Sequence, residues 1–160
     1  MGSIPQNLQA VKSRIDAAAR ACGRDPQSVR LLAVSKTHAP ARVREACAAG
    51  QRAFGENYVQ EALDKMAALA ELPLEWHLVG PLQSNKTRAV AERFDWVHTV
   101  DREKVARRLS EQRPAALAPL QVLVQVNVSG EASKSGVSPG EAAALARAVS
   151  GMPRLRLRGL

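Results

Sequence analysis

The side chain with the clearest chemical potential is Lys36, which closes a short apolar segment at residues 31–36 (LLAVSK). Because strand side chains alternate between two faces, Leu32, Val34 and Lys36 are expected on the same face. A lysine at the edge of an apolar surface is partly removed from water, which disfavours its charged form. The neutral amine that remains can condense with an aldehyde to form a Schiff base. The alternative is a lysine that only marks the strand end and extends into solvent.

Further polar side chains follow or interrupt the later apolar segments. They are Glu56 and Asn57 after residues 53–55, His77 within residues 75–80, Gln83, Asn85 and Lys86 after it, Asn127 near the end of residues 120–128, and Lys134 in the loop at residues 129–136. Each has a purely structural alternative. Asn57 could cap a helix, His77 could be a hydrogen-bonded core histidine, and Asn85 and Lys134 could face solvent.

The elements that would position these side chains alternate regularly along the chain. Apolar spacing predicts helices at residues 4–22, 40–49, 57–69, 84–93, 101–112 and 138–150, and strands at residues 31–36, 53–55, 75–80, 96–100, 120–128 and 155–160. Expected N-caps are Asn57 with Gln60 and Ser138 with Glu141, both as capping boxes, together with Ser84 and Asp101.

Strands that alternate with helices through short connections indicate βαβ units and a parallel sheet. An open doubly wound sheet would carry a glycine-rich phosphate loop after its first strand, but residues 36–40 (KTHAP) contain no glycine. A (β/α)₈ TIM barrel, which keeps its functional groups at the carboxyl ends of the strands, therefore fits better. Because such barrels need about 250 residues, we expect residues 1–160 to form a single barrel domain that contains strands 1 to 6 and lacks the remainder.

Composition narrows the functional classes. The net charge of +8 suggests anionic partners, but the basic residues are scattered and form no familiar nucleic-acid motif, so a nucleic-acid-binding module is the weakest alternative. No apolar run is long enough for a membrane span, and residues 1–6 do not resemble a signal peptide. Cys22 and Cys47 form no metal pattern and read as buried free thiols, which fits a cytoplasmic protein.

Four motifs resemble the pyridoxal 5′-phosphate homeostasis proteins, the YggS/PROSC family. They are AVSKT at residues 33–37, FGENYVQE at residues 54–61, WHLVGPLQSNK at residues 76–86, and VNVSGE at residues 126–131 with SKSG at residues 133–136. Their order and spacing cover nearly the whole chain, which makes the resemblance specific.

The resemblance implies a barrel of the alanine racemase N-terminal-domain type in which Lys36 holds pyridoxal 5′-phosphate (PLP) as a Schiff base. It implies that Asn57 and His77 lie near the cofactor and that Asn85, Lys86 and Lys134 line the mouth. Family members bind and buffer the cofactor or deliver it to PLP-dependent apo-enzymes, with no firmly established catalysis. A PLP-dependent racemase or aldolase is the alternative, although racemisation needs acid–base groups on both faces of the substrate.

One departure concerns the phosphate end of the cofactor. The family's phosphate-binding Ser, Gly and Thr residues, and the arginine that faces the pyridine nitrogen, come from later strands that this sequence does not contain. We therefore expect the 160-residue chain to bind the cofactor weakly or not at all.

Overall fold

A computed structural model of the chain describes residues 2–160. In chain order its elements are α1 (Ile4–Ala21), η1 (Pro26–Ser28), β1 (Ala33–Val34), α2 (Pro40–Ala48), β2 (Ala53–Glu56), α3 (Val59–Ala68), β3 (Glu75–Leu78), η2 (Ser84–Lys86), α4 (Thr87–Arg93), β4 (Trp96–Val100), α5 (Glu103–Gln112), β5 (Leu120–Val124), α6 (Pro139–Ser150) and β6 (Leu155–Gly159).

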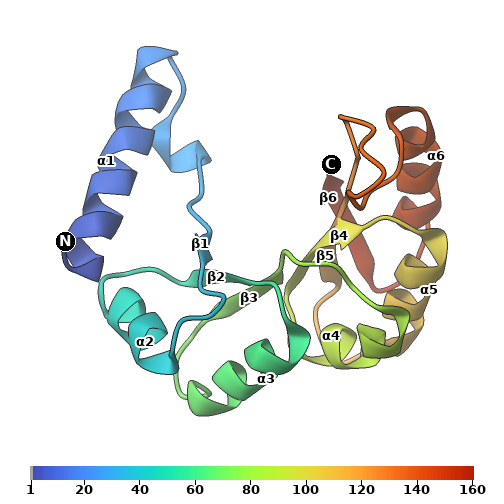
Figure 1. Cartoon of the computed structure of the whole chain (residues 1–160), viewed down its shortest axis with the longest axis horizontal. Coiled ribbons are helices and arrows are strands. Elements are labelled where there is room, and N and C mark those ends of the chain that lie inside the picture. The colour runs from blue at the N-terminus through green and yellow to red at the C-terminus, as the bar shows by residue number, and fades with distance from the viewer. Residues whose placement is uncertain (1) are drawn as a thin grey trace.

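The six strands form one parallel sheet in the order β1-β2-β3-β4-β5-β6, so each strand pairs with its sequence neighbour. Figure 1 shows the sheet as an arc with helices α2 to α6 along its outer side and no helix on its inner side. The predicted parallel βα array is confirmed. Within residues 2–160 the arc stays open, because β1 and β6 are its two edges and do not pair with each other.

The hydrophobic core lies between the sheet and the outer helices. Strand register places Phe54 beside Trp76, and Leu78 beside Val97, so alternate side chains of neighbouring strands enter this layer together. All four are buried there against apolar residues of the covering helices. The other alternating set of side chains points to the inner face, which carries polar and aromatic groups.

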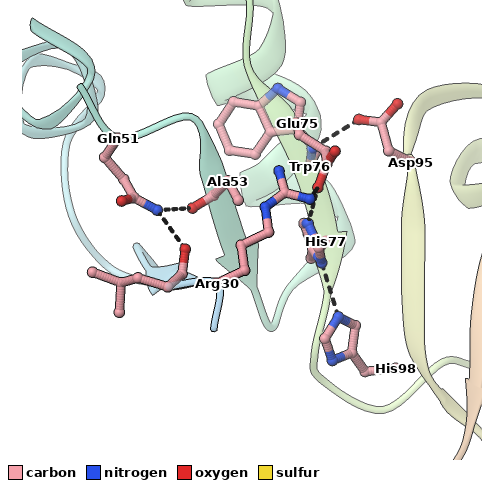
Figure 2. Close-up of polar contacts among 9 residues, drawn as sticks. Arg30, Gln51, Ala53, Glu75, Trp76, His77, Asp95 and His98 are labelled. Carbon is pink, nitrogen blue, oxygen red and sulfur yellow. Dashed lines mark hydrogen bonds and ion pairs between the residues drawn. The ribbon is translucent and has the colours of Figure 1, made fainter. Parts of the chain in front are cut away.

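Strand β1 is much shorter than the predicted strand at residues 31–36. Below the paired residues, the side-chain amide of Gln51 donates to the carbonyls of Leu31 and Ala53, at 2.9 and 2.8 Å, and replaces the backbone ladder there (Figure 2). Val34 remains 50% exposed because it points to the uncovered inner face. The expected long strand at residues 120–128 also ends early, at Val124, with one isolated bridge between Val126 and Val137 beyond it.

Several predicted caps differ from the structure. Tyr58, not Asn57, is the N-cap residue of α3, and it makes no side-chain cap bond. Arg102, not Asp101, precedes α5, and Ser84 begins a short 3₁₀ turn ahead of α4. The capping box of Ser138 and Glu141 is confirmed. The other three predictions miss by one residue or by a short 3₁₀ turn, which is the scale on which helix ends commonly vary.

The two cysteines also differ from each other. Cys47 is buried as predicted, whereas Cys22 lies at the exposed C-terminal cap of α1, so the prediction of a buried thiol there is wrong. Within residues 2–160, no helix combines the length and apolar character that a membrane crossing requires.

Candidate functional site

Lys36 lies two residues beyond β1, in a turn at the carboxyl end of the first strand. The ladder continues one residue beyond the strand, since the Ser35 amide donates to the Gly55 carbonyl at 2.9 Å. The Lys36 side chain is exposed in this structure. The expectation that its surroundings remove it from water is therefore wrong for residues 2–160, because nothing covers the inner face onto which strand alternation directs it.

Behind Lys36, on the helix-covered side of the sheet, lies a group that we call the Lys65 cluster: Ser35, Glu56, Glu61 and Lys65. The Lys65 ammonium contacts the Ser35 carbonyl at 2.6 Å, Glu56 Oε1 at 2.8 Å and Glu61 Oε1 at 2.6 Å. The Ser35 hydroxyl donates to Glu56 Oε1 at 2.6 Å. The Lys65 side chain is 5% exposed and that of Glu56 is fully buried, so this is an enclosed ionic group.

The two carboxylates of the cluster have different surroundings. Glu61 Oε1 also accepts a hydrogen bond from the Thr37 amide at 2.6 Å. The Lys65 ammonium, helped by this amide, lowers the pKa of Glu61 below its usual value, although burial opposes the shift. The second carboxylate oxygen of Glu56, Oε2, is buried and has no hydrogen-bond partner within residues 2–160.

Lys65 was missed in the sequence because a lysine on a helix is ordinarily exposed. A signal was nevertheless present. Lys65 falls on the buried stripe of α3 beside Ala62 and Met66, and it follows Glu61 by four residues, the spacing of a helical ion pair.

Asn57 lies directly after β2 and is held against the next strand by a close backbone approach. A Cβ on Gly80 would lie 2.2 Å from the Asn57 carbonyl oxygen and 2.6 Å from its Cα, so only glycine fits there. This contact explains the glycine of the WHLVGP segment. It also brings together the chain segments that leave β2 and β3.

His77 lies on the inner face within a line of polar contacts that we call the His77 chain: Arg30, Glu75, His77 and His98 (Figure 2). Arg30 pairs with Glu75 at 2.9 Å, Glu75 Oε1 lies 2.5 Å from His77 Nε2, and His77 Nδ1 lies 2.9 Å from His98 Nε2. The Trp96 ring stacks on His77 with ring centroids 5.2 Å apart. His77 therefore matches the hydrogen-bonded alternative, and His98 is a member that sequence reasoning did not select.

The chain of contacts fixes the tautomers of both rings. An ionised carboxylate only accepts, so Nε2 of a neutral His77 donates to Glu75 and its Nδ1 accepts from the Nε2–H of His98. Burial lowers the pKa of both histidines, and for His77 this outweighs the opposing effect of Glu75. The lowered pKa values favour the neutral form of both rings at neutral pH, and in that form this order of donors and acceptors holds.

Asn85 and Lys134 lie on two exposed loops. Asn85 is in η2, and Lys134 is in the segment between β5 and α6. Asn127 organises the second loop, because its side chain donates to the Glu131 carbonyl at 2.9 Å and accepts from the Gly130 amide at 3.1 Å. Within residues 2–160 neither Asn85 nor Lys134 forms a side-chain hydrogen bond with Lys36, Asn57 or His77. Their roles at a cofactor site remain predictions.

Comparison with known proteins agrees with this architecture. Residues 6–160 match the family model described as "Alanine racemase, N-terminal domain". The chain is 65% identical over 160 residues to the pyridoxal phosphate homeostasis protein of Pseudomonas aeruginosa, an alignment that covers all of this chain and 70% of that protein.

Two solved structures show the same fold. PipY of Synechococcus elongatus, determined with PLP bound, superimposes with a TM-score of 0.77 at 42% identity, over 91% of this chain and 68% of PipY. Alanine racemase from Corynebacterium glutamicum gives a TM-score of 0.69 at 17% identity, over 97% of this chain and 42% of the racemase, a likeness of fold alone. The chain thus belongs to the alanine racemase N-terminal-domain family and, within it, to the pyridoxal phosphate homeostasis proteins.

Proposed function

We propose that this chain binds PLP through Lys36 and acts in PLP homeostasis as a carrier or buffer of the cofactor. The observation that carries the proposal is the position of Lys36. It stands at the carboxyl end of the first strand, on the inner face of a fold that in PipY is seen with PLP bound. Barrels of this kind place their functional groups at that end of the strands.

The residues present suit the aldehyde end of the cofactor. Lys36, whose side chain is exposed, would hold PLP, and the cofactor would supply an aldehyde able to condense with a primary amine with loss of water. Asn57, His77, Asn85 and Lys134 are the further proposed cofactor contacts. For the phosphate end, residues 2–160 contain no built anion clamp. We therefore expect this chain to react with pyridoxal about as readily as with PLP.

We further propose that the protein is not a catalyst and that its partners are PLP-dependent apo-enzymes in the cytoplasm. Racemisation requires an acid–base group on each face of the substrate carbon, and tyrosine is one side chain suited to that work. The single tyrosine of this sequence, Tyr58, is 58% exposed at the start of α3. Its exposure gives no support to a catalytic role.

The test is to trap the adduct. The chain is incubated with PLP, reduced with borohydride and digested, and the labelled lysine is identified by mass spectrometry. We expect Lys36 to carry the label and Lys36→Ala to abolish the absorbance band of the adduct. Lys104→Ala, at an exposed position on α5, is the matched control and keeps both signals. A full band in Lys36→Ala, or label mainly on another lysine, contradicts the proposal.

A further inference from the structure

The two residues that flank Lys36 are both held by side chains of the Lys65 cluster. On one side the Ser35 carbonyl accepts from Lys65 Nζ at 2.6 Å, and on the other the Thr37 amide donates to Glu61 Oε1 at 2.6 Å. Glu61 Oε1 in turn lies 2.6 Å from the same Lys65 Nζ. The backbone around Lys36 is therefore fastened to α3 on both sides, through one lysine and one glutamate.

The backbone needs this support, because Thr37 has a φ of 63°. A β-branched residue in the left-handed region is strained and persists only where its surroundings hold it. The bond from the Thr37 amide to Glu61 is a contact of the strained residue itself. The chain therefore turns away from β1 immediately after Lys36 at a defined angle.

The cluster acts from behind the strand. Ser35 is buried on the helix-covered side, whereas strand alternation directs Lys36 to the inner face. The clamp thus fixes the backbone of Lys36 without occupying the space in front of its amine. Within the cluster Glu56 anchors Lys65 from β2 through a contact of 2.8 Å, and it is completely buried, so the clamp has a fixed base.

We propose that Lys65 and Glu61, anchored by Glu56, are positioning residues for Lys36: they hold its backbone so that the amine is presented to an aldehyde on the inner face. This inference rests on the proposed function. It assigns roles to residues that need not touch the cofactor and act only through the peptide units at residues 35–37.

The sharpest test uses Glu61, which is 30% exposed in its side chain and whose replacement should leave the core intact. In Glu61→Ala the Thr37 amide loses its acceptor, while Glu61→Gln keeps a side-chain oxygen at the same place. Asp64→Ala is the matched control, because it removes a carboxylate from the same helix at an exposed position outside the Lys65 cluster.

Two quantities are measured in each folded variant: the rate at which PLP and borohydride label Lys36, and the hydrogen exchange of the Thr37 amide by NMR. We expect Glu61→Ala to label Lys36 about tenfold more slowly, since small losses of alignment cost reaction rate steeply. Its Thr37 amide should exchange about tenfold faster, as expected for the loss of one hydrogen bond. Glu61→Gln and Asp64→Ala should stay close to the unmodified chain in both, and thermal melts confirm that all variants are folded.

The outcomes separate this inference from the function on which it rests. If the unmodified chain labels Lys36 but Glu61→Ala labels it equally fast, the positioning role is wrong and the proposed function stands. If Glu61→Gln is as slow as Glu61→Ala, the carboxylate charge and not the Thr37 contact matters, which also overturns the role. If the unmodified chain does not label Lys36, the proposed function fails and the positioning role fails with it.

Discussion

The Lys65 cluster and the His77 chain lie on opposite faces of the same sheet and differ in how completely the fold encloses them. The Lys65 cluster lies between β2 and α3, and its lysine and Glu56 have almost no exposure. The His77 chain lies on the inner face; its histidine His77 is only 6% exposed, but Arg30 is 58% exposed and Glu75 is 29% exposed. Charges buried between the sheet and a helix are stabilised mainly by their ion-pair partners, whereas charges on an exposed face are stabilised largely by water.

This difference in burial indicates what each group can do. The enclosed cluster has fixed partners and suits the holding of backbone, here the residues around Lys36. The His77 chain ends in two histidines with lowered pKa values, so its contribution to stability depends on pH. Three changes should separate these two behaviours, and a fourth, at Gly80, tests the backbone contact that joins the segments after β2 and β3.

The largest effect is expected from Lys65→Met. It removes the cation that compensates Glu56 and Glu61 and leaves a fully buried carboxylate unpaired. We expect a loss of about 3–5 kcal/mol in the free energy of unfolding, measured by urea denaturation. Lys104→Met on the exposed face of α5 is the control and should change stability by less than about 0.5 kcal/mol. The double variant Lys65→Met/Glu56→Gln should recover part of the loss, and no recovery would contradict the charge explanation.

Gly80→Ala should have the second-largest effect on stability, because it forces apart the two segments that leave β2 and β3. The added Cβ would meet the Asn57 backbone at 2.2 Å, and backbone cannot yield as a flexible side chain does. We expect a loss of about 1–3 kcal/mol, the range typical of overpacking, in the same urea measurement. Gly140→Ala is the control: its Cβ meets nothing within 4 Å, and alanine favours the helix α6. Equal stability of the two variants would show that the sheet adjusts freely at Asn57.

Lowering the pH should reduce the free energy of unfolding of the protein, because the two histidines of the His77 chain become protonated. Burial lowers the folded-state pKa of His77 and His98 below the ordinary value of 6.5, with Arg30 and the other histidine adding to this for His77 and Glu75 opposing it. As the pH falls below that value the unfolded chain binds protons first, so the stabilisation present above it is progressively lost.

Urea denaturation at about pH 7.5 and about pH 5.5 measures this loss. The double variant His77→Gln/His98→Gln should show a smaller difference between the two pH values. His38→Gln removes the exposed third histidine and should keep the full difference. If the double variant loses as much stability between the two pH values as the unmodified chain does, the pH response arises elsewhere in the molecule.

The smallest effect is expected from Arg30→Ala, which breaks an ion pair on the open face. Because Arg30 is more than half exposed, we expect a change of at most about 1 kcal/mol in urea denaturation. High salt should reduce even that difference, whereas it should leave the effect of Lys65→Met largely intact. A loss for Arg30→Ala as large as that for Lys65→Met would remove the contrast between the two faces.

The sequence by itself determined the alternation of strands and helices, the parallel sheet and the motifs around Lys36, Asn57 and His77. These follow from local periodicity and from residue types at fixed spacing, which the chain carries wherever it folds. The capping box at Ser138 could also be predicted from the sequence, because all of its hydrogen bonds lie within four residues.

Only the tertiary structure decided which charges are buried and which side chains they pair with. The burial of Lys65 depends on Ser35 and Glu56, which lie 30 and 9 residues away in the chain, and the partner of His77 at His98 is 21 residues distant. No local pattern encodes such pairings, since the packing of α3 on the sheet and the register of β3 with β4 create them. The exposure of Lys36 has the same origin: the sequence predicts the amine on the inner face, and only the assembled sheet shows that residues 2–160 leave this face uncovered.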